Sequence, residues 1–270
     1  MISDPVRREP ALNMPGLVLA SILVLVGIHL GREWVAPTTD LQWLLEGGFV
    51  PARWSLACGF ALPDDIMREA AAAGSDADAV TAEAALARYA AASGAASPFS
   101  ALTYALLHGS WMHVTLNCVW LAAFGSPVVR RCGAGRAAVL ALVTAVGAAF
   151  THWALNPLSP QIVIGASGIV SGFMGAAALF VFERPSTFGG WQPAVAPRRS
   201  SIAGLLRNRS ALMFLGTWFG INLLLGLAAA PLGIAEGGIA WQAHLGGLLT
   251  GLLVFPYLDP AGRGLRPREA

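Results

Sequence analysis

Charged residues are scarce in this 270-residue sequence, where they make up only 12% of the chain. That share is about half of what an ordinary soluble domain carries. Lysine is absent altogether, so all 17 basic residues are arginines, while hydrophobic residues make up 56% of the chain. No basic patch alternates with exposed aromatic residues, so we expect no nucleic-acid partner. The long stretches without charge predict an integral membrane protein that contacts the lipid bilayer.

Cysteine is scarce as well, and its spacing excludes the common metal motifs. The three cysteines are Cys58, Cys118 and Cys132, and they form no Cys-x-x-Cys pair and no cluster with histidine. We therefore expect no metal site and no cofactor. Cys118 and Cys132 fall in or near apolar segments, where a free thiol behaves as a small packing residue. Cys58 lies in a loop and has no evident disulfide partner.

Apolar runs dominate the rest of the chain. A membrane-spanning helix needs about 20 mostly apolar residues. Six runs meet or approach this length: 15–31, 101–125, 137–157, 165–182, 210–230 and 239–257. We keep the first run as a helix, although a signal peptide is the alternative. The sequence thus predicts an all-α, polytopic bundle of six transmembrane helices over residues 15–257, between tails at 1–14 and 258–270.

The arginines indicate the orientation of this bundle. Thirteen of the 17 lie on one side of the predicted topology, at positions 7, 8, 130, 131, 136, 184, 198, 199, 207, 209, 263, 266 and 268. Arginine accumulates on the cytoplasmic side, so both termini are predicted to be cytoplasmic. The long loop 32–100 then lies outside. Its Ala-rich stretch 63–93 predicts one or two short helices near the membrane surface.

A hydroxyl stands at the start of the fourth run, in the segment Gly165-Ala166-Ser167-Gly168. Ser167, Ser171 and Gly175 are spaced four residues apart and so share one helix face. A face of small residues lets another helix approach closely, and packing alone is one interpretation of it. The other interpretation makes Ser167 a nucleophile at membrane depth.

The sixth run contains one ionisable residue, His244. Ionisable groups are costly inside a membrane, so they mark functional positions. Gly247 and Gly251 follow on the same face of the helix. If this face packs against the small-residue face of the fourth helix, His244 and Ser167 become neighbours at the outer end of both helices.

The second run adds a histidine and an asparagine one helical turn apart, His113 and Asn117. Such side chains can donate to a developing oxyanion, and the Ser167 amide near a helix N-terminus can do the same. The alternative is that the pair only ties its helix to a loop. His29 and His152 lack partners of this kind, and we interpret them as hydrogen-bonded structural residues.

These three elements together resemble the rhomboid family of intramembrane serine proteases, in its bacterial six-helix form, over about residues 99–257. The family has a Gly-x-Ser-Gly motif in its fourth helix, here Gly165 to Gly168. It has a His-x-x-x-Asn motif in the second, here His113 to Asn117. It has an Ala-His followed by Gly-x-x-x-Gly in the sixth, here Ala243-His244 and Gly247 to Gly251.

The resemblance implies a role for each matched residue. Ser167 would be the nucleophile and His244 the base, while His113, Asn117 and the Ser167 amide would form the oxyanion hole. Supporting positions would be His108, Gly165, Gly168, Ser171, Gly247 and Gly251. Substrates would be single-span membrane proteins cut near the outer end of their transmembrane segment. The expected location is a bacterial inner membrane.

The sequence departs from the family pattern at two places. Phe99 and Ser100 stand where many bacterial members have a Trp-Arg pair, so the external loop must be anchored differently. Ser171 stands where many have a tyrosine stacked on the catalytic histidine, which leaves open what orients His244. No acidic residue falls within a predicted span, so a Ser-His dyad is expected rather than a triad.

Two other functions fit the same composition. A small membrane transporter could use buried His, Ser and Asn side chains as a relay, but the sequence has no intramembrane acid and no inverted repeat. A catalytically inactive rhomboid-like protein that binds membrane clients is the second alternative. Loss of the serine or the histidine would be typical of such a protein, and this sequence retains both.

Overall fold

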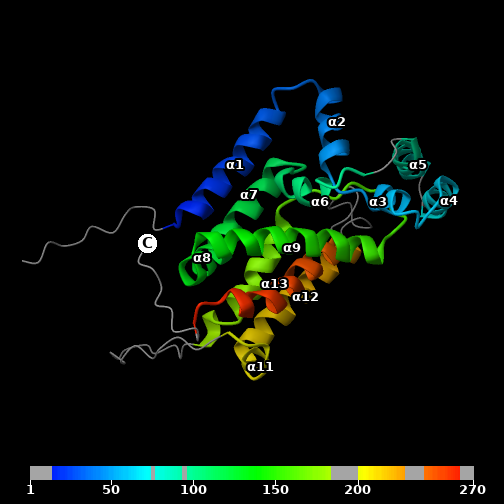
Figure 1. The fold of residues 1–270 in the computed structure, drawn as a ribbon. Helices are drawn as coiled ribbons and strands as arrows, with labels where there is room; N and C mark the ends of the chain where they lie inside the picture. Colours follow the sequence, from blue (N-terminus) through cyan, green and yellow to red (C-terminus); the bar gives the residue numbers. More distant parts are fainter. Residues whose placement is uncertain (1–13, 74–76, 93–95, 184–199, 229–239, 262–270) are drawn as a thin grey trace, which may run out of the picture.

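The computed structural model describes residues 14–73, 77–92, 96–183, 200–228 and 240–261. The regular structure within these ranges is helical, as the sequence predicts (Figure 1). The elements are α1 (Gly16–Arg32), α2 (Pro37–Gly47), α3 (Pro51–Ala57), α4 (Pro63–Ala73), α5 (Ala77–Ala92), α6 (Ser100–Thr103), η1 (Tyr104–Leu106), α7 (Trp111–Trp120), η2 (Leu121–Gly125), α8 (Ser126–Cys132), α9 (Ala134–Leu155), α10 (Ser167–Ala178), η3 (Val181–Glu183), α11 (Ile202–Leu206), α12 (Arg209–Ala228) and α13 (Trp241–Leu258).

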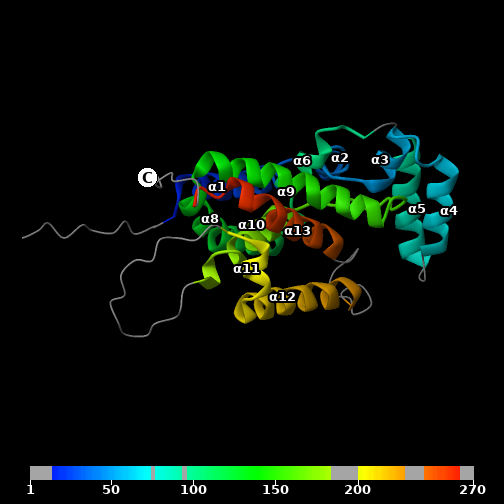
Figure 2. The ribbon, with the colours of Figure 1, turned by 60° about the horizontal axis from the view of Figure 1, so that its bottom comes forward.

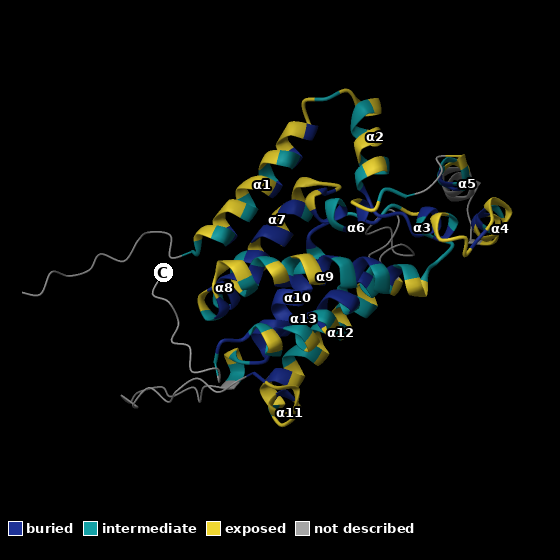
Figure 3. Cartoon of the chain, in the orientation of Figure 1, coloured by how far each residue is buried: buried dark blue, intermediate teal, exposed yellow. Residues whose placement is uncertain are grey.

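Helix α10 is the centre of the bundle. Nearly all of its residues are buried, and it packs against both α9 and α13. Figure 3 shows it as a dark blue helix behind the more exposed α9 and α8. Its sequence explains this position, because a helix that is apolar or small on every side has no face that favours water.

The glycine faces predicted for the fourth and sixth apolar runs do meet, as α10 against α13. A Cβ atom built on Gly247 would overlap the backbone carbonyl of Gly168, and one on Gly251 would overlap that of Gly172. The two backbones are therefore in direct contact, which only glycine permits at these positions. Helix α9 docks in a similar way, since Thr144 lies against Gly172 and Thr250 of α13 lies against Gly147.

The segment between α1 and α6 forms a separate layer at one end of the bundle. Helices α3, α4 and α5 share a small core of Val50, Ala52, Ile66, Ala70, Ala87 and Ala90. Figures 1 and 2 both place α4 and α5 at the far end from α8 and α11. The short helices expected within 63–93 are thus confirmed as α4 and α5.

Hydrogen bonds anchor this layer without the Trp-Arg pair of the family pattern. The backbones of Phe49 and Val163 bond each other in both directions, at 2.9 and 2.8 Å. The indole of Trp54 donates to the Ser100 hydroxyl at 3.1 Å. Ser100 is buried, whereas Phe99 is 71% exposed. Of the two positions that depart from the pattern, Ser100 therefore takes part in the anchoring.

The prediction of one helix over 101–125 was wrong. The chain forms α6 and η1, leaves helical geometry at Leu107, and begins a new helix at Trp111. The cause is local, because the Ser110 side chain accepts a hydrogen bond from the His113 amide and caps the new helix. That helix then continues through η2 and α8 to Cys132.

Three helical stretches of the described residues are long and apolar enough to cross a membrane: Trp111–Cys132, Ala134–Leu155 and Arg209–Leu227. Gly16–Arg32 and Ser167–Ala178 are apolar but shorter. Helix α13 has 18 residues and includes the polar Gln242 and His244. The six-span topology and the orientation remain predictions. Most of the N-terminal tail, residues 184–199 and the predicted loop 231–238 lie outside the described residues.

A buried ion pair closes the opposite end of the bundle. Asp259, at the end of α13, accepts two hydrogen bonds from Arg131 of α8, at 3.0 and 2.8 Å, and one from the Ser200 amide at 2.9 Å. Burial by itself raises the pKa of a carboxyl group. The hydrogen bonds from Arg131 and Ser200 outweigh it and hold the pKa of Asp259 below its usual value.

The backbone contact between α10 and α13 predicts that substitution of two glycines will have very different effects on protein stability. Gly251→Val should lower the free energy of unfolding by about 3 kcal/mol or more, since the new side chain overpacks the contact. Gly216→Val is the matched control, because nothing lies within 4 Å of a Cβ atom at that position of α12. Thermal unfolding in detergent measures both. Equal melting temperatures for the two variants would show that α10 and α13 do not touch at Gly251.

Candidate active site

The nucleophile candidate and the base candidate lie within hydrogen-bond distance. Ser167 is the first residue of α10, and His244 is in the first turn of α13. The Ser167 hydroxyl oxygen is 2.8 Å from Nε2 of His244. Both side chains are partly buried. The glycine contact described above produces this proximity, because Gly168 follows Ser167 and Gly247 lies three residues beyond His244.

The turn before Ser167 has a backbone shape that requires glycine. Gly165 has φ of +118°, a region that L side chains rarely adopt. A Cβ atom there would also lie 2.7 Å from Nε2 of His113. The Gly165 amide donates to the Tyr104 carbonyl at 2.9 Å, which ties the turn to η1. The absence of a side chain at Gly165 therefore lets the His113 ring lie directly against this turn, close to the Ser167 hydroxyl.

His108 supports the same turn from outside. Its side chain is fully buried, and its Nε2 accepts a hydrogen bond from the Ala166 amide at 3.2 Å. The His108 carbonyl in turn accepts from the guanidinium of Arg32 at 2.5 Å. Arg32 also forms a two-point ion pair with Asp40, at 2.6 and 3.0 Å. A continuous chain of contacts thus leads from α1 and α2 to the residue before Ser167.

His113 and Asn117 both lie on α7, and His113 contacts this turn. The ring of His113 is 4.9 Å from that of His108, and its Nε2 points to Gly165. The Asn117 amide donates to the His113 carbonyl at 2.9 Å. An asparagine amide has two N–H groups, so this bond leaves one for another acceptor. The structure thus places His113 against Gly165, two residues before Ser167. The spacing of residues in the sequence could not establish this contact.

Ser171 does not take the place of a stacked aromatic ring. Its hydroxyl donates to the Ser167 carbonyl at 2.7 Å, one turn back on the same helix. That hydroxyl is therefore committed to its own helix rather than to the imidazole of His244.

Asn222 of α12 is a site residue that sequence reasoning missed. Its side-chain oxygen is 2.6 Å from Nδ1 of His244. Trp218, one turn earlier on α12, has its ring centre 6.4 Å from that of His244. The sequence feature that could have identified Asn222 is its position as a single amide side chain in the apolar run 210–230, since polar groups within a membrane span mark functional positions.

The remaining two histidines differ in part from the expectation. Both ring nitrogens of His29 are buried without a hydrogen-bond partner, so His29 is not the hydrogen-bonded residue that was expected. It packs instead against Trp111, edge to face at 4.7 Å. Nδ1 of His152 is also unpaired, although its ring lies within hydrogen-bond reach of Gln242.

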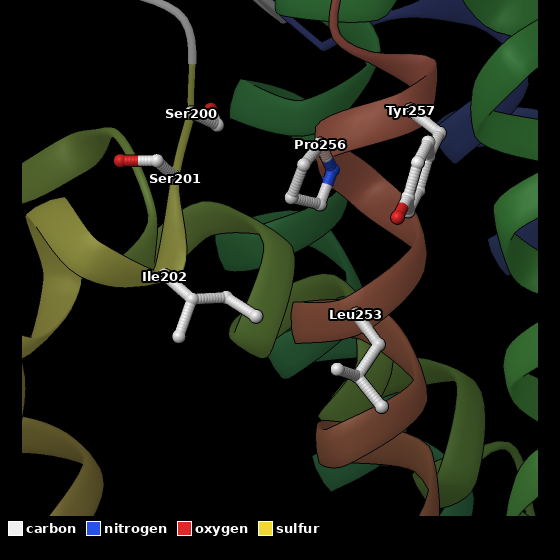
Figure 4. Close-up of a pocket in the computed structure, with 6 residues that line it drawn as sticks. All are labelled: Ser200, Ser201, Ile202, Leu253, Pro256 and Tyr257. Carbon is white, nitrogen blue, oxygen red and sulfur yellow. The ribbon is translucent and has the colours of Figure 1, made fainter.

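The described residues contain no cluster of three or more His, Cys, Asp or Glu side chains suited to a metal ion. All three cysteines are free, with Cys118 and Cys132 buried. A cavity of about 390 Å³ lies between α11 and the end of α13, lined by Ser200, Ser201, Ile202, Leu253, Pro256 and Tyr257 (Figure 4). It is at the opposite end of α13 from His244, so it is not part of this site.

The region that matches known proteins contains Ser167, His244, His113, Asn117 and Asn222. A family model described as Rhomboid domain matches residues 96–259. The protein Rhomboid protease GlpG of Serratia proteamaculans is 33% identical over 153 residues, which are 57% of this chain and 45% of that protein. The protein of the same name from Pectobacterium atrosepticum is 30% identical over 152 residues, 56% of this chain and 45% of its own length. The chain thus spans about half the length of these relatives.

The contacts that support His108 predict that substitutions of two aspartates will differ in their effect on protein stability. Asp40→Ala should lower the free energy of unfolding by about 2 kcal/mol, because it removes charged hydrogen bonds and leaves Arg32 buried without this partner. Asp64→Ala, at an exposed position of α4, is the control and should have little effect. Thermal unfolding of the purified variants compares them. An Asp40→Ala protein as stable as the control would show that the ion pair does not hold this layer.

Proposed function

The chain belongs to the rhomboid family, and from this premise we propose that it is an intramembrane serine endopeptidase. The observation that carries the proposal is the 2.8 Å approach of the Ser167 hydroxyl to Nε2 of His244. A serine beside a neutral imidazole is the arrangement that nucleophilic acyl transfer requires. The two relatives described above are named as proteases, which supports the same reaction class.

In this mechanism Ser167 Oγ attacks the carbonyl carbon of the scissile peptide while its proton passes to Nε2 of His244. The tetrahedral intermediate collapses as His244 returns the proton to the leaving amine, and an acyl-enzyme remains on Ser167. A water molecule then gives a proton to His244 and attacks the ester carbonyl. The bond to Ser167 Oγ breaks as His244 returns that proton to the serine oxygen, which releases the acid product and restores both residues. No carboxylate is needed as a third group if the imidazole is held in position by other means.

The negative charge on the tetrahedral oxygen needs donors, and we assign three. The Ser167 amide belongs to the first turn of α10, where backbone N–H groups have no partner within the helix. His113 lies beside Gly165, next to the reacting serine. Asn117, one turn further along α7, contributes the N–H group that its bond to the His113 carbonyl leaves free.

The proposed substrates are single-span membrane proteins. Ser167 lies at the end of an apolar buried helix, and the surrounding helices expose leucine and valine side chains that suit lipid. An intact transmembrane helix hides its peptide bonds within its own hydrogen bonds, so the substrate must unwind near its outer end before Ser167 can reach one. We place the protein in a bacterial inner membrane with both termini in the cytoplasm, as the arginine distribution indicates.

The dyad predicts that Ser167→Ala and His244→Ala each abolish cleavage of a model single-span substrate in liposomes. The double variant should be little worse than either single one, because the two residues act as one unit. Labelling with a serine-reactive fluorophosphonate should disappear in Ser167→Ala. Ser21→Ala is the control, since that hydroxyl bonds only to its own helix at Leu17. Substantial cleavage by purified Ser167→Ala protein would refute the assignment.

The oxyanion hole predicts that Asn117→Ala lowers turnover by about 10- to 1000-fold while the protein stays folded. Asn156→Ala is a closely matched control. The Asn156 amide donates to the His152 carbonyl four residues back, as Asn117 does to His113, but on a different helix. Turnover is measured with the same substrate, and folding by thermal unfolding. Wild-type turnover in folded Asn117→Ala protein would remove Asn117 from the site.

A further inference from the structure

We propose that Asn222 is a positioning residue for His244. Its side-chain oxygen accepts the proton on Nδ1 of the imidazole, which leaves Nε2 unprotonated and aimed at Ser167. This inference rests on the proposed function, because it explains how a dyad without a carboxylate keeps its base in the reactive form.

The geometry shows one chain of hydrogen bonds through the imidazole. Nε2 of His244 is 2.8 Å from the Ser167 hydroxyl, and Nδ1 is 2.6 Å from the Asn222 oxygen. The Asn222 amide nitrogen is 2.9 Å from the Trp218 carbonyl. Both polar atoms of the asparagine side chain are therefore engaged, each with a different partner.

The Trp218 carbonyl fixes the direction of every bond in this chain. A backbone carbonyl can only accept, so the asparagine group that faces it must be the NH₂ group. The oxygen of Asn222 then faces His244 and can only accept in its turn. Nδ1 must carry the proton of the neutral ring, and Nε2 is left with a lone pair toward Ser167. The opposite tautomer would place a lone pair of Nδ1 against the lone pairs of the Asn222 oxygen.

Other groups that could do this work are engaged elsewhere. The Ser171 hydroxyl bonds the Ser167 carbonyl instead of the ring. The ion pairs found among the described residues join none of the carboxylates to His244. The aromatic ring that lies near the His244 imidazole is that of Trp218, which is on α12 like Asn222. Helix α12 thus supplies both the hydrogen bond and the ring.

The position of Asn222 also argues for this role. Helix α12 lies at the edge of the bundle, beside α13 and below the other helices in Figure 2, and only 6% of its apolar stretch is buried in the protein. An amide in such a helix is unfavourable unless it is hydrogen-bonded. The bond to His244 satisfies it, and the ring of Trp241 packs against Gly226 one turn further along. The orientation of the base therefore depends on α12 staying against α13.

Two variants of similar shape distinguish a role of Asn222 in positioning His244 from a role in protein stability alone. Asn222→Leu keeps the volume but removes the acceptor, and its kcat should fall about 100-fold with KM unchanged. Asn222→Asp keeps an oxygen toward Nδ1 and should recover most of the lost kcat. Leu224→Ala, exposed on the same helix, is the control and should match wild type. A wild-type kcat in folded Asn222→Leu protein, or equal losses in the Leu and Asp variants, would overturn the proposal.

Ser167→Ala is measured in the same assay, so that the two levels of inference can fail separately. Activity in Ser167→Ala would refute the proposed function. An inactive Ser167→Ala beside a fully active Asn222→Leu would refute only the role of Asn222.

A second measurement needs no Asn222 variant and decides the matter even if Asn222→Leu does not fold. Nitrogen NMR of ¹⁵N-histidine-labelled protein reports the tautomer of each ring, and comparison with His244→Ala assigns the signals of His244. We expect the proton on Nδ1. A proton on Nε2 at neutral pH would overturn the proposal.

Discussion

The direct backbone contact between α10 and α13 is the constraint on which the rest of the site depends. The backbone carbonyl groups of Gly168 and Gly172 face Gly247 and Gly251, so the backbones of the two helices are in direct contact. Because Ser167 begins one helix and His244 lies in the first turn of the other, this approach sets their separation. Any side chain at the crossing would separate the reactive groups even though it touched neither of them.

A second set of contacts holds the turn that precedes the serine. The turn is bonded to η1 through Gly165 and to His108 through Ala166, and Arg32 secures His108 from α1. These contacts come from α1, from η1 and from the segment that joins η1 to α7. Asp40 of α2 adds to them through its ion pair with Arg32, so the segment that follows α1 also helps to fix the backbone from which Ser167 projects.

His244, the proposed base, is contacted from a third direction, by Asn222 of α12. That helix has few buried residues, unlike α10, which is buried almost throughout. The candidate site thus combines a serine on a buried helix with a histidine whose partner lies on a peripheral helix. Ser-His-carboxylate sites use a charge to hold the ring, and in the role that we propose for Asn222 a neutral amide would hold it without a carboxylate.

The sequence by itself determined the helical class, the apolar segments and the glycine faces, because each follows from local composition or helical spacing. The pairing of Ser167 with His244 was an expectation from the family resemblance and from the packing of those two faces, and the contact between α10 and α13 brings the two side chains together. It could not show that the run from residue 101 breaks before Trp111, where a serine cap outweighs hydrophobicity. Only the tertiary structure joined Arg32 to His108 and Asn222 to His244. Those contacts link residues far apart in the chain, and a single polar residue in an apolar run does not indicate which distant partner it will meet.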